Sequence, residues 1–469
     1  MNISKANLIE LDPAELLPGQ RVIKEVNADG DALYIAAGVG GAAPYTSLSN
    51  IYGVIYDANA LSAADSCVKV ELRGGVLQEV SSFTSMPAHQ FRRCVINDIA
   101  NRKVAYYLAD DDSNFKRSGA PADLTGGDGD VYVEIPVVHC RKEVRDNGQT
   151  VFLVSAKPFA GSTPHEFFSC SANGDEVRAQ YISAYKAGLC NAAGSALWTS
   201  ENSGKPSVSG VRVRSVAGSK PWTERVYSDW NALLGGANIA NYAYYRFLSL
   251  MMLIEYGTPD SQAAFCDGFC NLTGDWNTVG LAYTRLSGRA NFGNGSGFIL
   301  ADAERDGALP FADGKKRIVQ SCYRGIEDPF GGLAELIGGV MAEHQLNGSA
   351  DNLTLRWTNA FSKYGAASST WEHTFGKVID AETMALSTKF GAFYPNGLMI
   401  ALPDKAASSS TGSCDGALIN PAYLGSGSSA YIWSNSSMFS GALGGVNAYR
   451  YDETVADANG EYISVRLQI

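Results

Sequence analysis

Short runs rich in valine, isoleucine, leucine and tyrosine, some alternating with polar positions, dominate the first part of the chain. They occupy 31–37, 51–57 and 67–80, and glycine, asparagine and aspartate separate them. Such runs predict β-strands, and the residues between them favour turns. Residues 1–85 are therefore predicted to form a small N-terminal β domain that serves attachment or oligomerisation.

A second group of β-type runs follows, at 92–96, 102–110 and 129–141. In the last run, valine and isoleucine occupy the odd positions from Val131 to Val137, and Tyr132 and Glu134 lie between them. Because successive side chains of a strand point to opposite faces, this pattern predicts a strand with one buried face. Residues 86–170 are predicted to form a β-rich connecting region.

The strongest helical pattern in the chain covers residues 228–257. Ser228 or Asp229 can cap its start, and Gly235–Gly236 is expected to divide it. Hydrophobic residues of its second half share one stripe, which predicts a core helix. These residues are Tyr245, Leu248, Met252 and Ile254.

After Gly257 the chain is rich in glycine and has no clear period, but tryptophans recur at wide intervals. They are Trp276, Trp357, Trp371 and Trp433. Long irregular loops anchored by buried aromatic side chains would explain this pattern. The predicted fold class is α+β, with a β-rich N-terminal region followed by a C-terminal domain over 171–469.

The chain of 469 residues has 37 Lys and Arg against 48 Asp and Glu, and its net charge is −11. A nucleic-acid partner is not expected, because phosphate backbones are bound by clustered Lys and Arg. Membrane insertion is not expected, since the longest apolar run, 247–254, is too short to span a bilayer. The first residues lack a basic segment followed by an apolar run, so no signal peptide is predicted and synthesis is expected in the cytoplasm.

Several motifs imitate metal or cofactor sites. The glycine-rich segment 38–43 is followed by a proline and no helical period, so a turn is predicted rather than a dinucleotide site. In 165–169 a serine replaces the second histidine of a zinc-protease helix. The acidic segments 109–114 and 126–130 do not complete a calcium loop and are predicted to be solvated turns.

Cysteine chemistry is not predicted either. The nine cysteines have no regular spacing, and Cys266 and Cys270 lack a second ligand pair, so reduced and buried thiols are favoured. The sequence shows no basic partner for Cys322 that would lower its pKa. Nearby, an ion pair of Arg324 with Glu327 or Asp328 is predicted to fix a loop. No catalytic residue, metal or cofactor is therefore predicted.

Several segments together resemble a family of phage structural proteins. A Tyr-Tyr-Leu strand at 106–108 and a Gly-x-Asp-Gly-Asp-Val-x-Val-Glu-Ile-Pro strand at 126–136 resemble the lead-in of these proteins. Residues 253–262 and 323–340 resemble two segments of their C-terminal domain, which has a C-type lectin fold of the formylglycine-generating-enzyme type. The family includes phage receptor-binding proteins of the major tropism determinant class and the variable proteins of diversity-generating retroelements.

The chain departs from this family at several positions. Gly332, Ala334 and Leu336 stand where asparagine and tryptophan are common, so the local packing must differ. The chain closes on 461–469 rather than on the Gly-Phe-Arg strand frequent in the family. The enzymatic branch uses two reactive cysteines late in its domain, whereas this chain has only Cys414 there, so the resemblance does not imply that activity.

The resemblance implies that 171–469 is a C-type lectin-like domain whose segment before the final strand contacts a receptor. The corresponding segment, 428–454, is dense in Tyr, Trp, Ser, Asn and Arg, which recognise ligands at small entropic cost. The candidate ligand-binding residues are Tyr431, Trp433, Asn435, Met438, Phe439, Asn447, Tyr449, Arg450 and Tyr451. The sequence leaves open a second interpretation, in which Trp433 and Phe439 complete the core.

The resemblance also implies a non-enzymatic protein whose partner is a host-surface receptor, either a protein or a glycan. It implies a homo-oligomer, commonly a trimer, because several weak sites together bind strongly. The expected location is the virion tail, or the bacterial cell after cytoplasmic synthesis. Two alternatives remain: an enzyme of the formylglycine-generating-enzyme-like fold that depends on Cys414, and a purely structural virion protein without a receptor.

Overall fold

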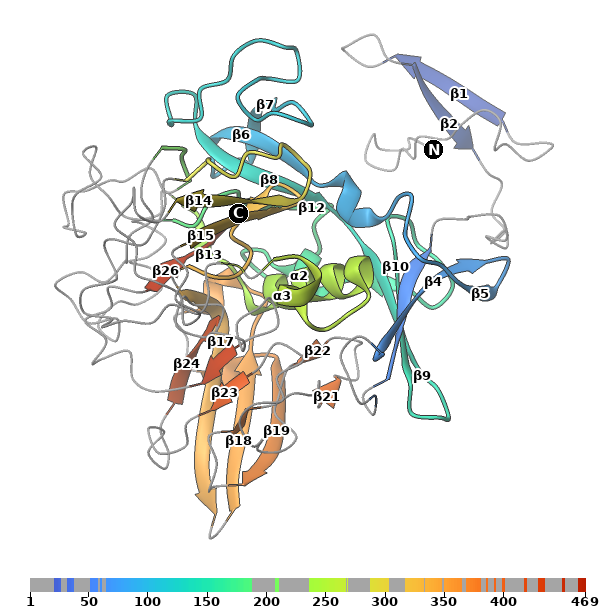
Figure 1. Ribbon diagram of the computed structural model, residues 1–469, viewed down its shortest axis with the longest axis vertical. Coiled ribbons are helices and arrows are strands. Elements are labelled where there is room, and N and C mark those ends of the chain that lie inside the picture. Colours follow the sequence, from blue (N-terminus) through green and yellow to red (C-terminus); the bar gives the residue numbers. More distant parts are fainter. Residues whose placement is uncertain are drawn as a thin grey trace, which may run out of the picture. The chain divides into compact units, whose positions relative to one another are not determined.

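The computed structural model divides the chain into two compact units, Met1–Ser47 and Leu48–Ile469, which are described separately. The described residues are 21–26, 32–37, 51–57, 60, 65–187, 207–210, 236–266, 268, 287–302, 317–332, 334–347, 350–364, 368–380, 385–386, 392–393, 399–400, 417–419, 429–434, 449–451 and 463–469. The fold is β-rich, with several antiparallel sheets and few helices (Figure 1). The domain boundaries predicted after residues 85 and 170 stay predictions.

The first unit contains an antiparallel hairpin of β1 (Arg21–Val26) and β2 (Ala32–Ala37), in which Arg21 pairs with Ala37. The glycine-rich segment 38–43 lies outside the described residues. No helix in the described part of the chain is both long and apolar enough to cross a membrane.

The second unit contains two six-stranded antiparallel sheets. The first has the order β11-β9-β10-β3-β4-β5, built from β3 (Tyr52–Tyr56), β4 (Cys67–Arg73), β5 (Val76–Glu79), β9 (His139–Val144), β10 (Thr150–Ser155) and β11 (Thr163–Pro164). The second has the order β13-β27-β12-β8-β6-β7, built from β6 (Arg92–Asp98), β7 (Lys103–Tyr107), β8 (Asp130–Pro136), β12 (Ala179–Ser183), β13 (Asn238–Ile239) and β27 (Leu467–Gln468). The last strand of the chain therefore lies inside a sheet, between β12 and β13.

Strand β8 is buried on both faces, which corrects the prediction of a single buried face. Val131 and Val133 belong to the main hydrophobic core, as predicted. Tyr132, on the opposite face, is also fully buried, in a second core with Cys94 of β6 and Leu467 of β27. The sequence pattern could not show this, because tyrosine occurs both in cores and on half-exposed strands.

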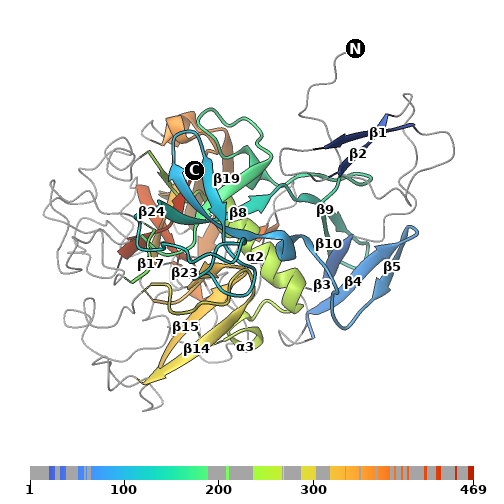
Figure 2. The ribbon, with the colours of Figure 1, turned by 90° about the horizontal axis from the view of Figure 1, so that it is seen from above.

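The helix α2 (Tyr242–Tyr256) lies at the centre of the main core (Figures 1 and 2). Its residues from Tyr242 to Ile254 are all buried, so the predicted stripe is confirmed but is only part of the buried surface. A helix that is apolar on all sides requires neighbours on all sides. The helix ends at Gly257, whose φ of 70° is a left-handed conformation that glycine adopts without strain.

Asn241 caps the start of α2. Its side-chain oxygen accepts a hydrogen bond from the amide of Ala243 at 2.9 Å, and its Nδ2 donates to the Thr358 carbonyl oxygen and the Tyr364 hydroxyl at 2.8 and 2.7 Å. Gly339 must be glycine here, because an added Cβ would lie 2.7 Å from Asn241 Nδ2. The predicted caps Ser228 and Asp229 lie outside the described residues.

Two further sheets follow α2 and the short helix α3 (Ser261–Ala264). One contains β14 (Gly297–Asp302), β15 (Arg317–Tyr323) and β16 (Ile326–Glu327). The other has the order β19-β18-β17-β24-β25-β23-β20, with β26 (Ile463–Val465) pairing with β17, and its strands are β17 (Ala334–Asn347), β18 (Ala350–Trp357), β19 (His373–Asp380), β20 (Ala385–Leu386), β23 (Ala417–Ile419), β24 (Ser429–Ser434) and β25 (Tyr449–Tyr451). A separate two-stranded sheet joins β21 (Ala392–Phe393) and β22 (Met399–Ile400).

The long strands β17, β18 and β19 correct the prediction that this region is irregular throughout. Trp357 and Trp371 are buried anchors as predicted, but Trp357 is the last residue of β18 rather than part of a loop. The glycine pair within β17 interrupts any alternating pattern, and this is why the strand was not predicted. Trp276 lies outside the described residues.

Replacing Asn241 with alanine is expected to lower the free energy of unfolding by about 3 kcal/mol, because it removes the helix cap and leaves buried groups of Thr358 and Tyr364 without a partner. Urea unfolding followed by circular dichroism would measure the loss. The matched control is Asp260→Ala, which removes the more exposed cap of α3 and should cost about 1 kcal/mol or less. Equal losses in the two variants would contradict the role given to Asn241.

Candidate ligand-binding site

The backbone brings together two parts of the predicted binding segment. Tyr431 and Trp433 lie on β24, and Tyr449, Arg450 and Tyr451 form β25. The two strands pair antiparallel, with position 433 opposite 450 and position 434 opposite 449. The remaining candidates lie outside the described residues. They are Asn435, Met438, Phe439 and Asn447.

The register divides the candidate positions between the two faces of the sheet. Residues directly opposite each other in an antiparallel pair share a face, and alternate residues of a strand share a face. Positions 431, 433 and 450 therefore lie on one face, whereas 449 and 451 lie on the other. A ligand bound to a single face would contact only one of these two sets, a division that the sequence did not indicate.

Strand β24 is held between β25 and β17 in the middle of the eight-stranded sheet. Position 433 lies opposite Leu336 of β17, and Leu336 also pairs with Val465 of β26. Leu336 and Val465 are buried in the second core. The predicted binding segment therefore pairs, through β24, with a strand whose own residues are fixed by the core.

A buried network of charges holds this part of β17. Glu335 Oε1 lies 2.9 Å from Nη2 of Arg466 and 3.4 Å from Nζ of Lys186, and the Tyr245 hydroxyl donates to Glu335 Oε2 at 2.9 Å. All four residues are nearly inaccessible to solvent. A buried carboxylate is tolerated only when it is paired and hydrogen-bonded, and Glu335 meets both conditions.

The guanidinium of Arg466 also satisfies three main-chain oxygens. Nη1 donates to the Ser183 carbonyl at 3.0 Å, and Nη2 donates to the carbonyls of Glu327 and Asp328 at 2.9 and 3.0 Å. The planar donor fork of arginine suits such a set of acceptors. One side chain near the end of the chain therefore connects β12, the end of β16 and β17.

The charge states follow from this pairing. Burial alone would raise the pKa of Glu335, but Arg466 and Lys186 outweigh it and hold the pKa below its ordinary value. Burial lowers the pKa of Lys186, and Glu335 opposes that change. Sequence reasoning missed these residues. The available signal was a lone charge within an apolar run, as for Arg466 between Val465 and Leu467.

The segment 321–340 has a structural role in which each charged group has a distant partner. Arg324 forms its ion pair with Glu255 at the end of α2, so the predicted pairing with Glu327 or Asp328 is wrong. The left-handed φ of Arg324, 49°, helps to explain the difference, because it places this residue in a turn after β15. Because Glu255 is far from Arg324 along the chain, the sequence around Arg324 does not reveal this partner.

Cys322 does have a basic partner, Arg93, which the sequence did not reveal. Arg93 Nη2 lies 3.6 Å from the thiol sulfur, and the guanidinium also donates to the Gly325 carbonyl at 2.6 Å and to Ser113 Oγ at 3.0 Å. Burial nevertheless raises the pKa of Cys322, and Arg93 only opposes the change. A buried thiol with a raised pKa is a poor nucleophile.

The acid pair that follows β15 also stabilises a loop. The Glu327 carboxylate accepts hydrogen bonds from the amides of Gly288 and Ala290 and from Gln320 Nε2, at 2.9 to 3.3 Å. Asp328 Oδ1 accepts from the Ser321 amide at 3.0 Å. Burial raises the pKa of both acids, and their proximity adds to the effect for Glu327.

The motif at 165–169 forms a short 3-10 helix, η4 (Glu166–Ser169), rather than a zinc-protease helix. His165 caps it, because its Nδ1 accepts a hydrogen bond from the Phe167 amide at 3.1 Å. Burial, together with the charge of Arg246, lowers the pKa of His165 well below its usual value. His165 is therefore neutral at pH 7, with its proton on Nε2.

Metal and thiol chemistry find little support in the described residues. No group of three His, Cys, Asp or Glu side chains there could hold a metal ion. The described cysteines are free thiols, namely Cys67, Cys94, Cys140, Cys170, Cys266 and Cys322. Cys270 and Cys414 lie outside the described residues.

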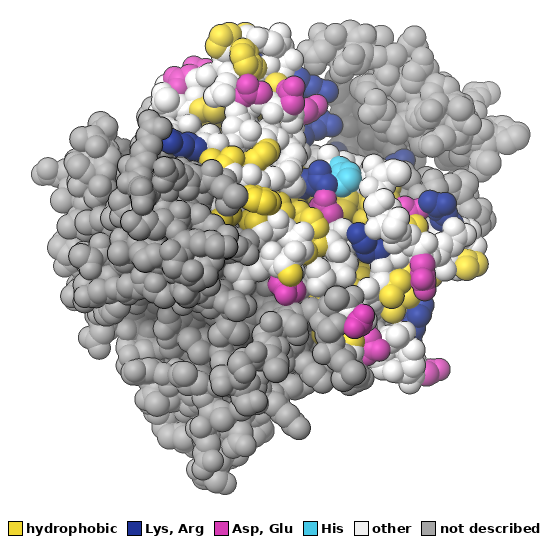
Figure 3. Space-filling model, viewed as in Figure 1, with side chains coloured by type: hydrophobic (Ala, Val, Ile, Leu, Met, Phe, Trp, Pro, Cys, Tyr) yellow, Lys and Arg dark blue, Asp and Glu magenta, His cyan; other side chains and the backbone are white. Residues whose placement is uncertain are grey.

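The described surface mixes charges of both signs. Figure 3 shows Lys and Arg side chains interspersed with Asp and Glu over the described part of one face. Ion pairs such as Lys363 with Glu372 and Arg141 with Glu143 belong to this pattern. Interspersed charges favour solubility over the binding of a polyanion. The expected absence of a nucleic-acid partner stays a prediction.

Comparison of the sequence with models of known protein families found no match, and comparison with curated proteins found no similar sequence. The resemblance to phage receptor-binding proteins and retroelement-diversified proteins therefore depends on the motifs within this chain alone.

Replacing Arg466 with methionine is expected to destabilise the protein by about 3–5 kcal/mol, because Glu335 and three carbonyl oxygens lose their buried donor. The free energy of unfolding in urea would show it. Lys363→Met is the control, since it breaks an ion pair with Glu372 whose two side chains are 42% and 38% exposed, and it should cost about 1 kcal/mol at most. A near-neutral Arg466→Met variant would be inconsistent with a central role for the network.

The buried neutral state of His165 predicts a specific dependence of stability on pH. Below pH 6.5 the histidine of the unfolded chain binds a proton that the folded state does not, so stability falls as pH falls, by up to about 1.4 kcal/mol per unit. Thermal unfolding from pH 7.5 to 5 should show a shallower acid slope in His165→Asn, because asparagine keeps the cap acceptor but does not titrate. Identical slopes in His165→Asn and the wild-type protein would refute the assignment.

Proposed function

We propose that this chain is a non-enzymatic receptor-binding protein of the phage receptor-binding or retroelement-diversified type. Its region 171–469 is a C-type lectin-like domain, and the segment containing β24 and β25 contacts a host-surface receptor, either a protein or a glycan. The observation that supports this most directly is the antiparallel pairing of β24 with β25. It joins two aromatic-rich parts of the segment side by side in one sheet.

The support of these strands agrees with a binding role. A binding surface gains affinity when its residues are held in place before the ligand arrives, since less conformational entropy is lost. Strand β24 pairs with β17, and β17 is held by the buried ion pairs of Glu335 with Arg466 and Lys186. Such a foundation suits a surface whose side chains vary or adapt while the scaffold stays constant.

The thiol-dependent alternative rests on Cys414, which lies outside the described residues, so this alternative stays a prediction. Among the described cysteines, burial raises the pKa of Cys94, Cys170 and Cys322, which opposes formation of the reactive thiolate. The acid pair Glu327 and Asp328 is engaged by main-chain amides. We further propose a homo-oligomer in the virion tail or at the bacterial surface, because repeated weak sites raise the overall affinity.

The double variant Tyr449→Ala, Tyr451→Ala is expected to reduce binding to host cells by tenfold or more, on the order of a single aromatic hot spot. Flow cytometry of the labelled full chain on a panel of bacterial strains would measure the binding. Arg450→Ala tests the opposite face of the same strand and shows which face carries the contact. Phe115→Ala, an exposed aromatic residue 43% accessible to solvent, is the matched control.

Two outcomes would contradict the proposal. If the double tyrosine variant and Arg450→Ala both bind as well as the wild-type chain, the β24–β25 surface is not the site. If the wild-type chain binds no strain and purified particles contain it at a high fixed copy number, the purely structural role is favoured. Circular dichroism and thermal unfolding of each variant would separate lost binding from lost folding.

A further inference from the structure

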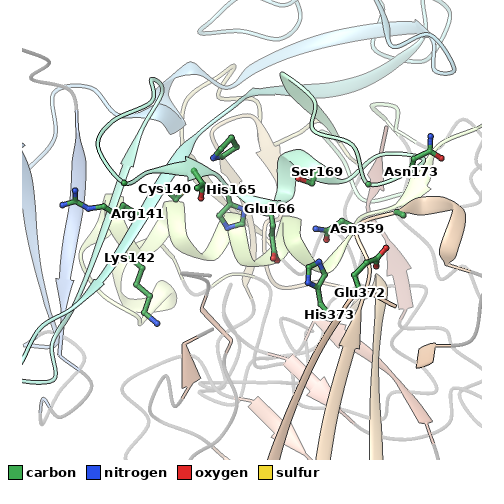
Figure 4. A pocket seen from close by; sticks show the side chains of 15 residues that line it. Cys140, Arg141, Lys142, His165, Glu166, Ser169, Asn173, Asn359, Glu372 and His373 are labelled. Carbon is green, nitrogen blue, oxygen red and sulfur yellow. The ribbon is translucent and has the colours of Figure 1, made fainter. Parts of the chain in front are cut away.

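A cavity of about 740 Å³ opens in the second unit, at the end of the β9 sheet and beside η4 (Figure 4). Its lining comes from three stretches that are far apart in the sequence. They are 140–142, 161–174 and 359–373. A volume of this size suits a small ligand.

Several buried polar atoms of the lining residues have no hydrogen-bond partner among the described residues, and apart from Nε of Arg141 and the ion-paired Oε1 of Glu166 they belong to two neutral side chains. One atom is Nε2 of His165, a residue only 2% exposed, and the other is Oδ1 of Asn359, which is 7% exposed. His165 Nε2 carries the proton, because Nδ1 accepts from the Phe167 amide, and it is therefore a donor. Asn359 Oδ1 is an acceptor. Buried polar atoms are rarely left unsatisfied, so this pair indicates a place where something else binds.

Three charged side chains at the cavity have ion-pair partners within the protein, and Lys142, which also lines the cavity, is not free either. Glu166 Oε1 lies 2.5 Å from Nη1 of the buried Arg246, and Glu372 pairs with Lys363. On the opposite side, Arg141 pairs with Glu143. An ionic ligand would have to compete with these partners, so the cavity has no strong preference for a charge. The lining also lacks the three grouped ligands that a metal ion needs, as far as the described residues show.

One wall of the cavity is flat and held rigidly. The ring of His373 stacks on Trp357, with centroids 4.9 Å apart and planes inclined by 21°. The guanidinium of Arg246 lies 5.4 Å from the centroid of the same indole ring. In Figure 4 His373 and Glu372 lie on one side of the cavity and His165 on another, with Glu166 and Asn359 between them. Neutral donors and acceptors therefore face a space bounded by an aromatic ring.

We propose that this cavity binds a neutral saccharide of one or two rings. Each hydroxyl group of a sugar both donates and accepts, so neighbouring hydroxyls can satisfy His165 Nε2 and Asn359 Oδ1 together. The C–H face of the sugar ring can lie against the stacked wall at His373. An apolar ligand would leave the two buried atoms unsatisfied, and a zwitterion would find its counter-charges already paired. The assignment does not depend on the proposed receptor-binding function.

The test uses the full chain and defined sugars. Saturation-transfer NMR followed by calorimetric titration would compare glucose, galactose, N-acetylglucosamine, maltose and lactose with glucuronate, glucosamine and glycine. At least one neutral sugar should bind with a Kd below about 10 mM. Asn359→Ala and His165→Asn should each weaken that binding about fivefold or more, because each removes one hydrogen bond to the ligand.

Three controls make the result specific. Ser362→Ala changes an exposed residue outside the cavity and should bind as the wild-type chain does. The double variant of Tyr449 and Tyr451 should also keep sugar binding, which separates this site from the receptor surface. Asn359→Ala should not lower the melting temperature, because its Oδ1 makes no hydrogen bond within the described residues. If it fails to fold, His165→Asn alone decides the test.

Several results would overturn the proposal. One is the absence of any neutral sugar binding below the stated Kd. Another is a preference for glycine or for the charged sugars, which would assign a different ligand class. A third is sugar binding that survives both Asn359→Ala and His165→Asn, since this would place the sugar elsewhere on the chain.

Discussion

The buried guanidinium of Arg466 imposes the constraint on which this part of the structure depends. A cation without access to water must be neutralised and must have its N–H groups occupied. Glu335 supplies the negative charge, and the carbonyls of Ser183, Glu327 and Asp328 supply further acceptors. Strands from three distant parts of the sequence therefore meet at one point near the end of the chain. The segment proposed to bind a receptor immediately precedes that point in the sequence.

Helix α2 connects the buried ion pair of Arg466 and Glu335 with the main core. Tyr245 donates to Glu335, and Asn241 joins the start of the helix to Thr358 and Tyr364. Because α2 is buried on all sides, a shift of the helix would disturb packing against several sheets at once. Strand β17 and the main core therefore hold each other in place. A binding site requires such a rigid scaffold.

Local patterns in the sequence predicted the strands and the helix, because these elements are determined mainly by residues close together in the chain. The β-type runs became β3, β4, β6 and β8, and the helical stripe became α2. Several failures have a different cause, since they concern partners that are distant along the chain. Arg324 pairs with Glu255 and Cys322 contacts Arg93, and neither pairing leaves a mark in the neighbouring sequence. The cavity was hidden for the same reason, because its lining comes from three separate stretches.

Among the described residues, buried charged groups stabilise the fold, whereas neutral polar groups are available at the cavity. Arg93, Arg246 and Arg466 are fully buried, and each is engaged by partners inside the protein. At the cavity, a neutral imidazole and an amide each keep a polar atom without a hydrogen bond within the described residues. Neutral groups lose less solvation on binding than charges do, and they form weak bonds that discriminate by shape. A scaffold that is fixed by internal ion pairs and offers neutral groups to a ligand favours many weak contacts over one strong ionic contact. Weak contacts of this kind gain most in overall affinity when several copies of the chain bind together.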